Sequence, residues 1–278
     1  MIDPAPLRVR ALVESRFRLD GGAMFGVVPK PLWSRAFPAD ERNRIGLVCR
    51  VLLLEGAGRV VLVDAGMGDA WSDKERDIYA LAPDGGLDAA LASAGRSASE
   101  VTDVVLTHLH FDHAGGIARA DGALRFPTAT HHVQAAHLAW ARAPSPKDAG
   151  SFRRATMAAI ERARLRLLDG PGGVLPGVEA ELSGGHTEAL QVLTIAAHAG
   201  PVVFAADLVP THAHVHPPWM MAYDNHPIRC LAEKTALFAR LAASGARLVL
   251  EHDPEVEAVT VRREGDRWIG EPTCIGAP

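Results

Sequence analysis

The chain has 278 residues, of which 48% are hydrophobic and 22% are charged. These values are ordinary for a globular protein, and a chain of this length buries a core large enough to fold without covalent cross-links, so global disorder is excluded. The 29 basic and 33 acidic side chains give a net charge of −4. Binding to a phosphate backbone requires a basic surface, so we expect no nucleic-acid partner.

Cysteine usage and hydrophobic patterning narrow the class further. Cys49, Cys230 and Cys274 lie far apart and are odd in number, which excludes a disulfide framework and a cysteine-based zinc site. Residues 1–10 lack the basic-then-apolar pattern of a signal peptide. The longest apolar runs, such as Leu47–Leu54, are far shorter than the roughly 18 residues needed to span a bilayer. We therefore expect a cytoplasmic protein without membrane association.

The first predicted elements form a hairpin. Apolar, β-rich runs at Leu47–Leu54 and Arg59–Asp64 flank the turn sequence Glu55–Gly58. The Ala- and Leu-rich segment Pro83–Gly95 predicts a helix. Val101–Thr107 predicts a further strand, which ends in a cluster of His and Asp residues.

The rest of the chain repeats this alternation of strands and helices. A Pro/Ser-rich segment, Ala143–Ser151, precedes a predicted helix over Phe152–Leu168, where apolar residues recur every three or four positions. The remaining predicted elements are strands at Leu190–Ala196, Pro201–Ala206 and Arg247–Glu251 and a helix at Leu231–Ala243. This order predicts an α/β sandwich. No polar segment is long enough to be a linker, so we expect one domain over residues 1–278.

Candidate metal ligands follow the strand at Val101–Thr107. Among the 13 histidines of the chain, His108, His110 and His113 surround Asp112. In an extended chain His108 and His110 point the same way, and a turn into a helix would bring the next two side chains to an adjacent point. Two neighbouring clusters of this type suit a pair of divalent ions. A polar turn satisfied by hydrogen bonds is the alternative.

Three more candidates lie at the ends of other predicted strands or in tight turns. His186 follows Gly184 and Gly185, which allow the backbone to approach a shared centre. Asp207 and His252 directly follow predicted strands. Each would be ordinary by itself, but their order after the first cluster favours ligands that collect on an α/β scaffold.

The pattern His-x-His-x-Asp-His, followed by Gly-His, an isolated Asp and a late His, resembles the metallo-β-lactamase superfamily over Leu47–His252. The resemblance implies an α/β fold, the αββα metallo-β-lactamase sandwich of two similar halves, with a dinuclear site along the sheet edges. It implies one metal on His108, His110 and His186, a second on Asp112, His113 and His252, and Asp207 bridging both. We expect zinc from this donor set, with manganese, cobalt or iron as alternatives.

Two longer segments give a narrower resemblance. Asp20–Trp33 and Ala206–Asp224 resemble quorum-quenching lactonases of the YtnP type, and the end of the second segment also resembles the methyl parathion hydrolase-like branch. This implies a dinuclear metal-dependent hydrolase that opens a lactone ring, of the N-acyl homoserine lactone type, with a metal-bridging hydroxide. Asp112 would also steer the nucleophile and pass a proton to the leaving group.

Other functions remain as alternatives. The same metal site could instead hydrolyse another class of small-molecule ester, either organophosphate triesters or aryl esters. A mononuclear iron oxygenase needs only the first ligand set, and a non-catalytic metal-binding protein would be expected to lack ligands, whereas all seven positions are filled. Hydrophobic side chains expected at the edges of the fold, and the frequent dimerisation of proteins in the resembled family, favour a homodimer.

The chain departs from its relatives at two positions. Leu190 stands where many relatives have a second His that is usually not a ligand, so we expect no effect on the metals. Pro210 stands where better-studied lactonases have a Tyr near the substrate carbonyl, so His212 or Tyr223 would have to supply that polar group. Asp64 is either a carboxylate that orients a ligand imidazole or a turn-forming residue.

Two further groups have open roles. Alternation would place His212, His214 and His216 on one side of the chain, where they line the pocket, shuttle protons, hold a third metal or form a solvated loop. A set of large apolar side chains forms a pocket wall, part of the core or a dimer contact: Met24, Phe25, Trp33, Trp219, Met220 and Met221. The histidines without a partner pattern are expected to be structural: His131, His132, His137, His198 and His226.

Overall fold

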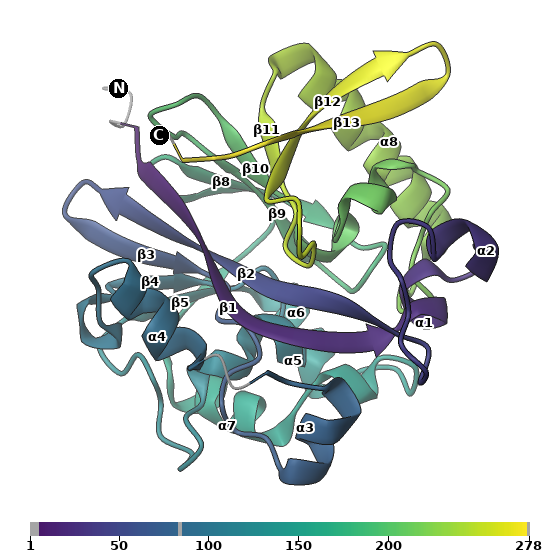
Figure 1. The fold of residues 1–278 in the computed structure, drawn as a ribbon. Helices are drawn as coiled ribbons and strands as arrows, with labels where there is room; N and C mark the ends of the chain where they lie inside the picture. Colours follow the sequence, from purple (N-terminus) through teal and green to yellow (C-terminus); the bar gives the residue numbers. More distant parts are fainter. Residues whose placement is uncertain (1–5, 83–84, 277–278) are drawn as a thin grey trace.

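Two β-sheets lie face to face at the centre of the structure, and helices cover their outer faces (Figure 1). The structure is a computed structural model that describes residues 6–82 and 85–276. The first sheet is built from the first half of the chain and the second sheet from the second half. This is the αββα arrangement that the sequence predicts.

The first sheet has six strands in the order of the sequence. Its strands are β1 (Arg8–Asp20), β2 (Arg44–Gly56), β3 (Arg59–Val63), β4 (Asp103–Val105), β5 (Thr130–Gln134) and β6 (Arg164–Leu168). The pairs from β1 to β3 are antiparallel, and those from β3 to β6 are parallel. Its helices are α3 (Asp73–Tyr79), α4 (Gly86–Ser93), α5 (Phe111–Ala114), α6 (Ala135–Arg142) and α7 (Arg154–Arg162). Buried apolar side chains of α4, α6 and α7 pack against this sheet.

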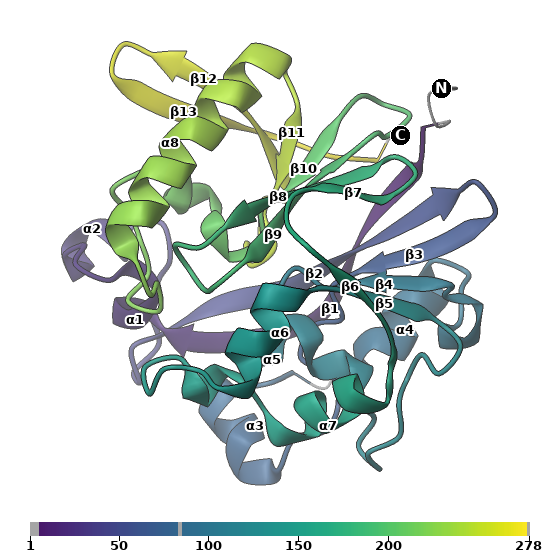
Figure 2. The same ribbon diagram turned by 180° about the vertical axis from the view of Figure 1, so that it is seen from behind.

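The second sheet has seven strands, in the order β13-β12-β11-β10-β9-β8-β7. Their bounds are β7 (Gly172–Leu175), β8 (Val178–Ser183), β9 (Leu190–Ile195), β10 (Val202–Phe204), β11 (Arg247–Val249), β12 (Ala258–Glu264) and β13 (Arg267–Thr273). Within this described sheet, β10 and β11 form the only parallel pair. The chain leaves β10, passes through α8 (Pro227–Ser244) and returns to begin β11, and this crossover lets the two strands run in the same direction. Figure 2 shows α8 across the outer face of this sheet, where Leu237, Phe238 and Leu241 are buried.

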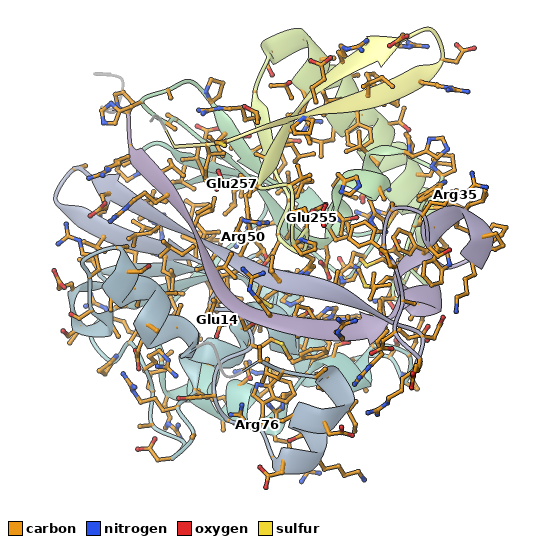
Figure 3. All side chains as sticks on the ribbon, viewed as in Figure 1. Glu14, Arg35, Arg50, Arg76, Glu255 and Glu257 are labelled. Carbon is orange, nitrogen blue, oxygen red and sulfur yellow. The ribbon has the colours of Figure 1, made fainter. Side chains whose placement is uncertain are left out.

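The two sheets share one apolar cluster and are also joined by hydrogen bonds along β2. Leu54 and Val63 of the first sheet belong to the same buried cluster as Phe204 of the second. The backbone N–H of Arg50 donates to the carbonyl oxygen of Glu251 over 3.0 Å. Its buried guanidinium, labelled near the centre of Figure 3, donates to the carbonyl oxygens of Leu250 and Asp253. These bonds fix the chain that follows β11 against the first sheet.

A third apolar cluster closes one end of the molecule around α1 (Gly21–Phe25) and α2 (Lys30–Trp33). The Asp20 side chain caps α1 by accepting a hydrogen bond from the N–H of Ala23 over 2.8 Å. Short 3-10 helices occupy Ala98–Glu100, Gly115–Ile117, Ala149–Ser151, Ala206–Leu208 and His212–Val215.

The structure confirms most predicted elements and corrects one. The antiparallel hairpin of β2 and β3 is present, and the predicted helix at Pro83–Gly95 corresponds to α4, with residues 83 and 84 outside the described part. The predicted helix over Phe152–Leu168 is wrong in its second half, because α7 ends at Arg162 and β6 begins at Arg164. β6 pairs in parallel with β5, and this pairing overrides the helical spacing of the apolar residues. Among the described helices, none combines the length and the apolar character needed to cross a membrane.

Candidate metal centre

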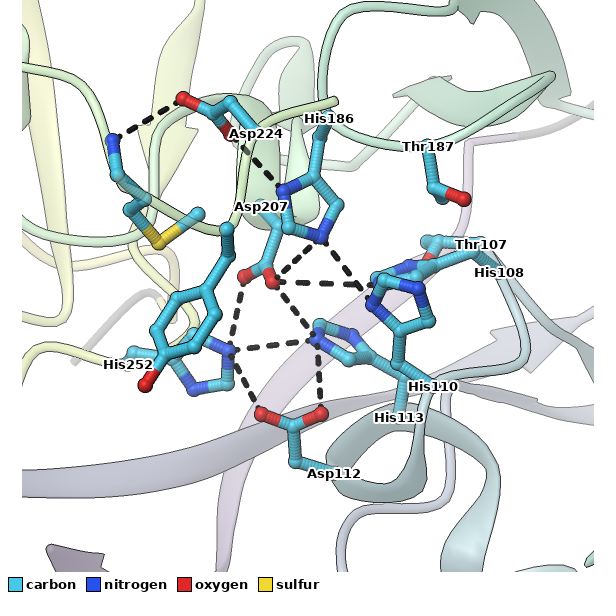
Figure 4. A network of polar contacts seen from close by, with 12 residues as sticks. Thr107, His108, His110, Asp112, His113, His186, Thr187, Asp207, Asp224 and His252 are labelled. Carbon is cyan, nitrogen blue, oxygen red and sulfur yellow. Dashed lines mark hydrogen bonds and ion pairs between the residues drawn. The ribbon is translucent and has the colours of Figure 1, made fainter. Parts of the chain in front are cut away.

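The seven predicted ligands lie together where strands of both sheets end (Figure 4). The segment after β4 carries four of them, and the segments after β8, β10 and β11 carry His186, Asp207 and His252. All seven side chains are buried. The two-sheet fold therefore brings together residues that are up to 144 positions apart in the chain (252 minus 108).

The ligands form two groups. Within each group, the potential ligand atoms all lie within 4.8 Å of one another. The first group consists of His108, His110, His186 and Asp207, and the second of Asp112, His113 and His252. In the first group, Nδ1 of His110 lies 3.2 Å from Nε2 of His186. In the second group, the Nε2 atoms of His113 and His252 lie 3.3 Å apart.

Asp207 lies between the two groups. Its Oδ2 atom is 3.1 Å from Nε2 of His186 and 3.5 Å from Nε2 of His113. Its Oδ1 atom is 2.9 Å from Nε2 of His252. One carboxylate thus faces imidazoles of both groups, which is the geometry expected of a shared ligand.

Each ligand imidazole has an acceptor atom close to the nitrogen that points away from the centre. The contact is a hydrogen bond for all of them except His110, whose Nε2 lies near a carboxylate oxygen without hydrogen-bond geometry. Nδ1 of His108 faces Oγ1 of Thr107, Nε2 of His110 faces Asp148, Nδ1 of His113 faces Asp64, Nδ1 of His186 faces Asp224, and Nδ1 of His252 faces the carbonyl oxygen of Val48. These contacts span 2.9 to 3.1 Å. An acceptor holds the imidazole proton on the outer nitrogen, so the inner nitrogen presents a lone pair to the centre.

The arrangement fits divalent metal ions. Two imidazole lone pairs that face each other over about 3 Å repel unless a proton or a metal ion lies between them. Within the described residues, the buried Nε2 atom of His108 has no hydrogen-bond partner. Imidazole and carboxylate donors in sets of three or four are those that zinc and similar ions use in proteins.

The Asp207 carboxylate attracts positive charge into the site. Burial lowers the pKa of both His186 and His252, but the surrounding carboxylates, Asp207 foremost, together raise these pKa values to about 10 and about 9. A buried anion between imidazoles therefore holds protons in the absence of a metal. A metal ion would have to displace them, so its affinity would increase with pH.

Asp64 combines the two roles considered for it. It follows β3 with φ of 56°, which turns the chain. Its carboxylate accepts hydrogen bonds from the N–H and the hydroxyl of Thr107 over 2.7 and 2.6 Å and lies 3.1 Å from Nδ1 of His113. Asp64 therefore orients His113 directly, and it orients His108 through Thr107.

Three other buried carboxylates at the site were not singled out from the sequence. Asp148 contacts His110, and Asp224 contacts His186, each over 3.0 Å. Oε1 of Glu251 lies 3.1 Å from Nδ1 of His113, and burial raises the pKa of Glu251 to about 7. Asp224 ends the lactonase-like segment Ala206–Asp224, whereas no motif marks Asp148 or Glu251.

A cavity of about 250 Å³ opens onto the centre. Asp112 and Asp207 contribute to its polar floor. Lys147, Gly150 and Ser151 line one part of its walls, and apolar and phenolic side chains line the rest: Leu19, Met24, Tyr79, Phe111, Met221 and Tyr223. Tyr223 thus lines the same cavity as Asp112 and Asp207.

The structure places His212 elsewhere. It lines a separate cavity of about 160 Å³, where Nδ1 lies 2.5 Å from Oδ2 of Asp253 and the ring stacks on Phe37. The expectation that His212, His214 and His216 share one side is wrong, because residues 212–215 form a 3-10 helix rather than an extended chain. His214 is buried, with Nε2 2.9 Å from the carbonyl oxygen of Met24.

The predicted apolar wall is divided between cavity and core. Met24 and Met221 line the cavity. Phe25 stacks between Trp33 and His214, with ring centroids 5.5 and 5.0 Å apart, inside the third apolar cluster.

The two departures from the family pattern have structural roles. Leu190 is buried in the apolar cluster between the sheets. The carbonyl oxygen of Pro210 accepts the backbone N–H of His252 over 3.0 Å. His137 is structural, as expected: it accepts the N–H of Leu109 over 2.8 Å and faces the carbonyl oxygen of Glu188 at 2.6 Å.

Comparison with known proteins decides the family. Residues 44–252 match the model of the metallo-β-lactamase superfamily. The chain belongs to this superfamily. The metallo-β-lactamase signature covers all seven candidate ligands, from His108 to His252.

Individual relatives within the superfamily agree with this placement. Two mycobacterial proteins, named "Probable metallo-hydrolase" Rv2300c (Mycobacterium tuberculosis) and Mb2322c (Mycobacterium bovis), are 38% identical over 148 residues, which is 48% of this chain. The chain spans 46% of the length of each. A solved structure described as a "probable metal-dependent hydrolase" from Staphylococcus aureus superposes with a TM-score of 0.88 and 29% identity, covering 99% of this chain and 100% of that one. The dizinc quorum-quenching lactonase AidC shares the fold, with a TM-score of 0.82 and 21% identity over 99% of this chain and 97% of its own.

Proposed function

We propose that this chain is a hydrolase that holds two divalent metal ions and opens the ring of N-acyl homoserine lactones. The observation that carries the proposal is the two pairs of inward-facing imidazole nitrogens with the Asp207 carboxylate between them. His108, His110 and His186 would hold one ion, Asp112, His113 and His252 the other, and Asp207 both. Zinc is the first choice for this donor set, with manganese, cobalt and iron as alternatives.

Such a pair of ions, when bound, lowers the pKa of a water molecule and polarises a substrate carbonyl group. Asp112 has two roles in the proposal. Its carboxylate lies at the cavity wall, with oxygens 3.8 Å from Nε2 of His113 and of His252. From this place it would accept the proton that the attacking water gives up and deliver it to the ring oxygen of the leaving alkoxide.

The cavity walls support a substrate with an apolar chain. Leu19, Met24 and Met221 offer an apolar surface to an acyl group. Burial raises the pKa of Tyr223, so its phenol keeps its proton at neutral pH and would donate a hydrogen bond to the substrate carbonyl oxygen. The lactonase-like segments Asp20–Trp33 and Ala206–Asp224 supply several of these wall residues. The structural likeness to the lactonase AidC agrees with this choice.

Proton release tests the proposal. Protein loaded with zinc or manganese is mixed with N-acyl homoserine lactones of short and long acyl chains, and a pH indicator follows ring opening. We expect turnover that depends on chain length. Asp207→Ala removes the shared ligand and should abolish turnover and the binding of one or both metals, whereas Asp266→Ala, in the exposed turn between β12 and β13, should retain both.

Two outcomes would contradict parts of the proposal. Full activity of Asp207→Ala would reject the metal centre. No turnover on any lactone, with two metal ions still bound per chain, would reject the lactone but leave the centre in place. Aryl esters and phosphotriesters would then be the substrates to examine, since the same nucleophile serves both.

A further inference from the structure

Asp148 has an unusual set of contacts for a loop residue. It lies between α6 and the 3-10 helix Ala149–Ser151, and it is 3% exposed. Its Oδ2 atom accepts hydrogen bonds from Trp140 Nε1, Thr187 Oγ1 and Asn225 Nδ2 over 2.7, 2.8 and 3.0 Å. The three donors lie in three different parts of the chain, so the position of this oxygen is fixed independently of the metal centre.

The other oxygen of Asp148 faces a candidate ligand. Oδ1 lies 3.0 Å from Nε2 of His110, whose Nδ1 atom faces His186 at the centre. Three donors occupy Oδ2, so Oδ1 is the carboxylate oxygen left to attract the imidazole proton to Nε2, from a 3.0 Å contact that lacks hydrogen-bond geometry in this structure. A proton held on Nε2 leaves a lone pair on Nδ1, which is the form of the ring that binds a metal through that nitrogen.

Asp148 also fixes the chain around His186. Thr187 directly follows His186, and Asn225 directly follows Asp224, whose carboxylate contacts Nδ1 of His186 over 3.0 Å. The backbone N–H of Asn225 donates to the carbonyl oxygen of His186 over 3.0 Å. One carboxylate therefore touches one candidate ligand and both chain segments that hold another.

We infer that Asp148 is a positioning residue that sets the tautomer of His110 and the place of His186, and thereby the metal affinity of the first ligand group only. The inference rests on the proposed metal centre and adds an asymmetry to it. None of the contacts described for Asp148 involves Asp112, His113 or His252. The second ligand group is instead held by Asp64, Glu251 and the carbonyl oxygen of Val48.

Replacement of Asp148 by asparagine separates this role from a purely structural one. The three donors would hold the amide oxygen of the new side chain, so its NH₂ group would face Nε2 of His110. That nitrogen would have to accept, and the imidazole proton would move to Nδ1, toward the metal position. Alanine leaves His110 free to choose either tautomer, but it leaves three buried donors without an acceptor.

The two variants should therefore rank in opposite order in two measurements. Asp148→Asn should lower the affinity for one of the two zinc ions by about 10- to 100-fold, and this loss should be greater than the loss in Asp148→Ala. Asp148→Ala should lower the unfolding temperature more than Asp148→Asn does. The control is Asp266→Asn, in the exposed turn between β12 and β13, which should leave both zinc affinities as in the wild type.

Zinc affinities are measured by competition with a chromophoric chelator, and the tautomer of His110 by ¹⁵N NMR of its ring nitrogens in metal-free protein. Wild type should show the proton of His110 on Nε2, and Asp148→Asn should show it on Nδ1. Unchanged zinc affinities and an unchanged tautomer in Asp148→Asn would overturn the inference while two bound zinc ions leave the proposed centre standing. Absence of zinc binding by the wild type would overturn both.

Discussion

Asp64 shows how a single residue serves two candidate ligands. Its positive φ of 56° turns the chain directly after β3, so that its carboxylate lies beneath the loop that follows β4. One oxygen accepts the Thr107 N–H, and the other accepts the Thr107 hydroxyl and faces His113. The Thr107 hydroxyl in turn faces Nδ1 of His108 at 3.0 Å. A change at Asp64 should therefore reach both ligand groups.

We predict that Asp64→Asn lowers the affinity for both zinc ions by about 10- to 100-fold. Asparagine tolerates positive φ, so the turn should persist. Its NH₂ group, however, cannot accept the protons that Thr107 and His113 offer. Chelator competition measures the effect, with the exposed Asp121→Asn as the control. A loss confined to one zinc ion would contradict the chain of contacts from Asp64 through Thr107 to His108.

At this scale the sequence predicts the ligands and one group that orients them, Asp64, but not the other orienting carboxylates. His108, His110 and Asp112 are recognisable because their spacing follows the geometry of one strand end and one turn. Asp148 and Asp224 lie in loops whose paths depend on the packed structure. Their roles could not be read from spacing, because each meets its histidine only after the two sheets have come together.

At the scale of elements, the segment with α5 is held by close backbone contact with the loop after β3. The N–H of Ala65 donates to the carbonyl oxygen of His113 over 2.6 Å, and the N–H of Gly116 donates to that of Gly66 over 3.1 Å. A β-carbon on Gly116 would lie 2.1 Å from the carbonyl oxygen of Ala65. Backbone atoms cannot move aside as a flexible side chain can, so this position requires glycine.

Gly116→Ala should lower the free energy of unfolding by about 1–3 kcal/mol or more, because the added methyl group separates two backbone segments. Urea unfolding measures the loss. The matched control is Gly46→Ala in β2, where a β-carbon meets no heavy atom within 4 Å. It should change stability by no more than about 0.5 kcal/mol. Equal stability of the two variants would contradict the prediction, because it would show that the loop after β3 moves enough to accommodate the methyl group.

Element prediction succeeded where apolar runs are buried on both faces and failed where tertiary pairing decides. β2 and β3 are recognisable from their apolar runs. β1 alternates charged and apolar residues over Arg8–Asp20 and was not predicted. In β6 the exposed Arg164 and Arg166 also alternate with leucines, but pairing with β5 is what makes this segment a strand rather than the end of α7.

For the whole molecule, buried neutral histidines link stability to pH. Burial lowers the pKa of His131 to about 4 and the pKa values of His137 and His214 to about 3. An unfolded histidine has a pKa near 6.5. At a pH between the native and the unfolded pKa, each of these histidines binds a proton in the unfolded chain but not in the native protein. The stabilisation is therefore complete above pH 6.5 and is lost as the pH falls toward the native pKa.

The free energy of unfolding should fall by about 1.4 kcal/mol per pH unit for each such histidine below pH 6.5. His214→Gln should reduce this slope by one proton, whatever it does to stability at pH 7, because glutamine does not titrate. Urea unfolding at pH 7, 6 and 5, with equal metal content for wild type and variant, measures the difference. Parallel pH profiles for the two proteins would show that His214 is not neutral in the native state.

The cavity draws its two kinds of surface from separate parts of the chain. The candidate ligands follow β4, β8, β10 and β11, whereas Leu19 lies next to the end of β1, Met24 lies in α1 and Met221 lies in the loop before α8. Substitutions in the second set change the shape of the walls without moving the residues that would hold the metals. Such a division lets selection, natural or in the laboratory, exchange one substrate for another while the reaction chemistry is inherited intact. A library randomised at the wall positions alone would be expected to yield new specificities on an unchanged catalytic floor.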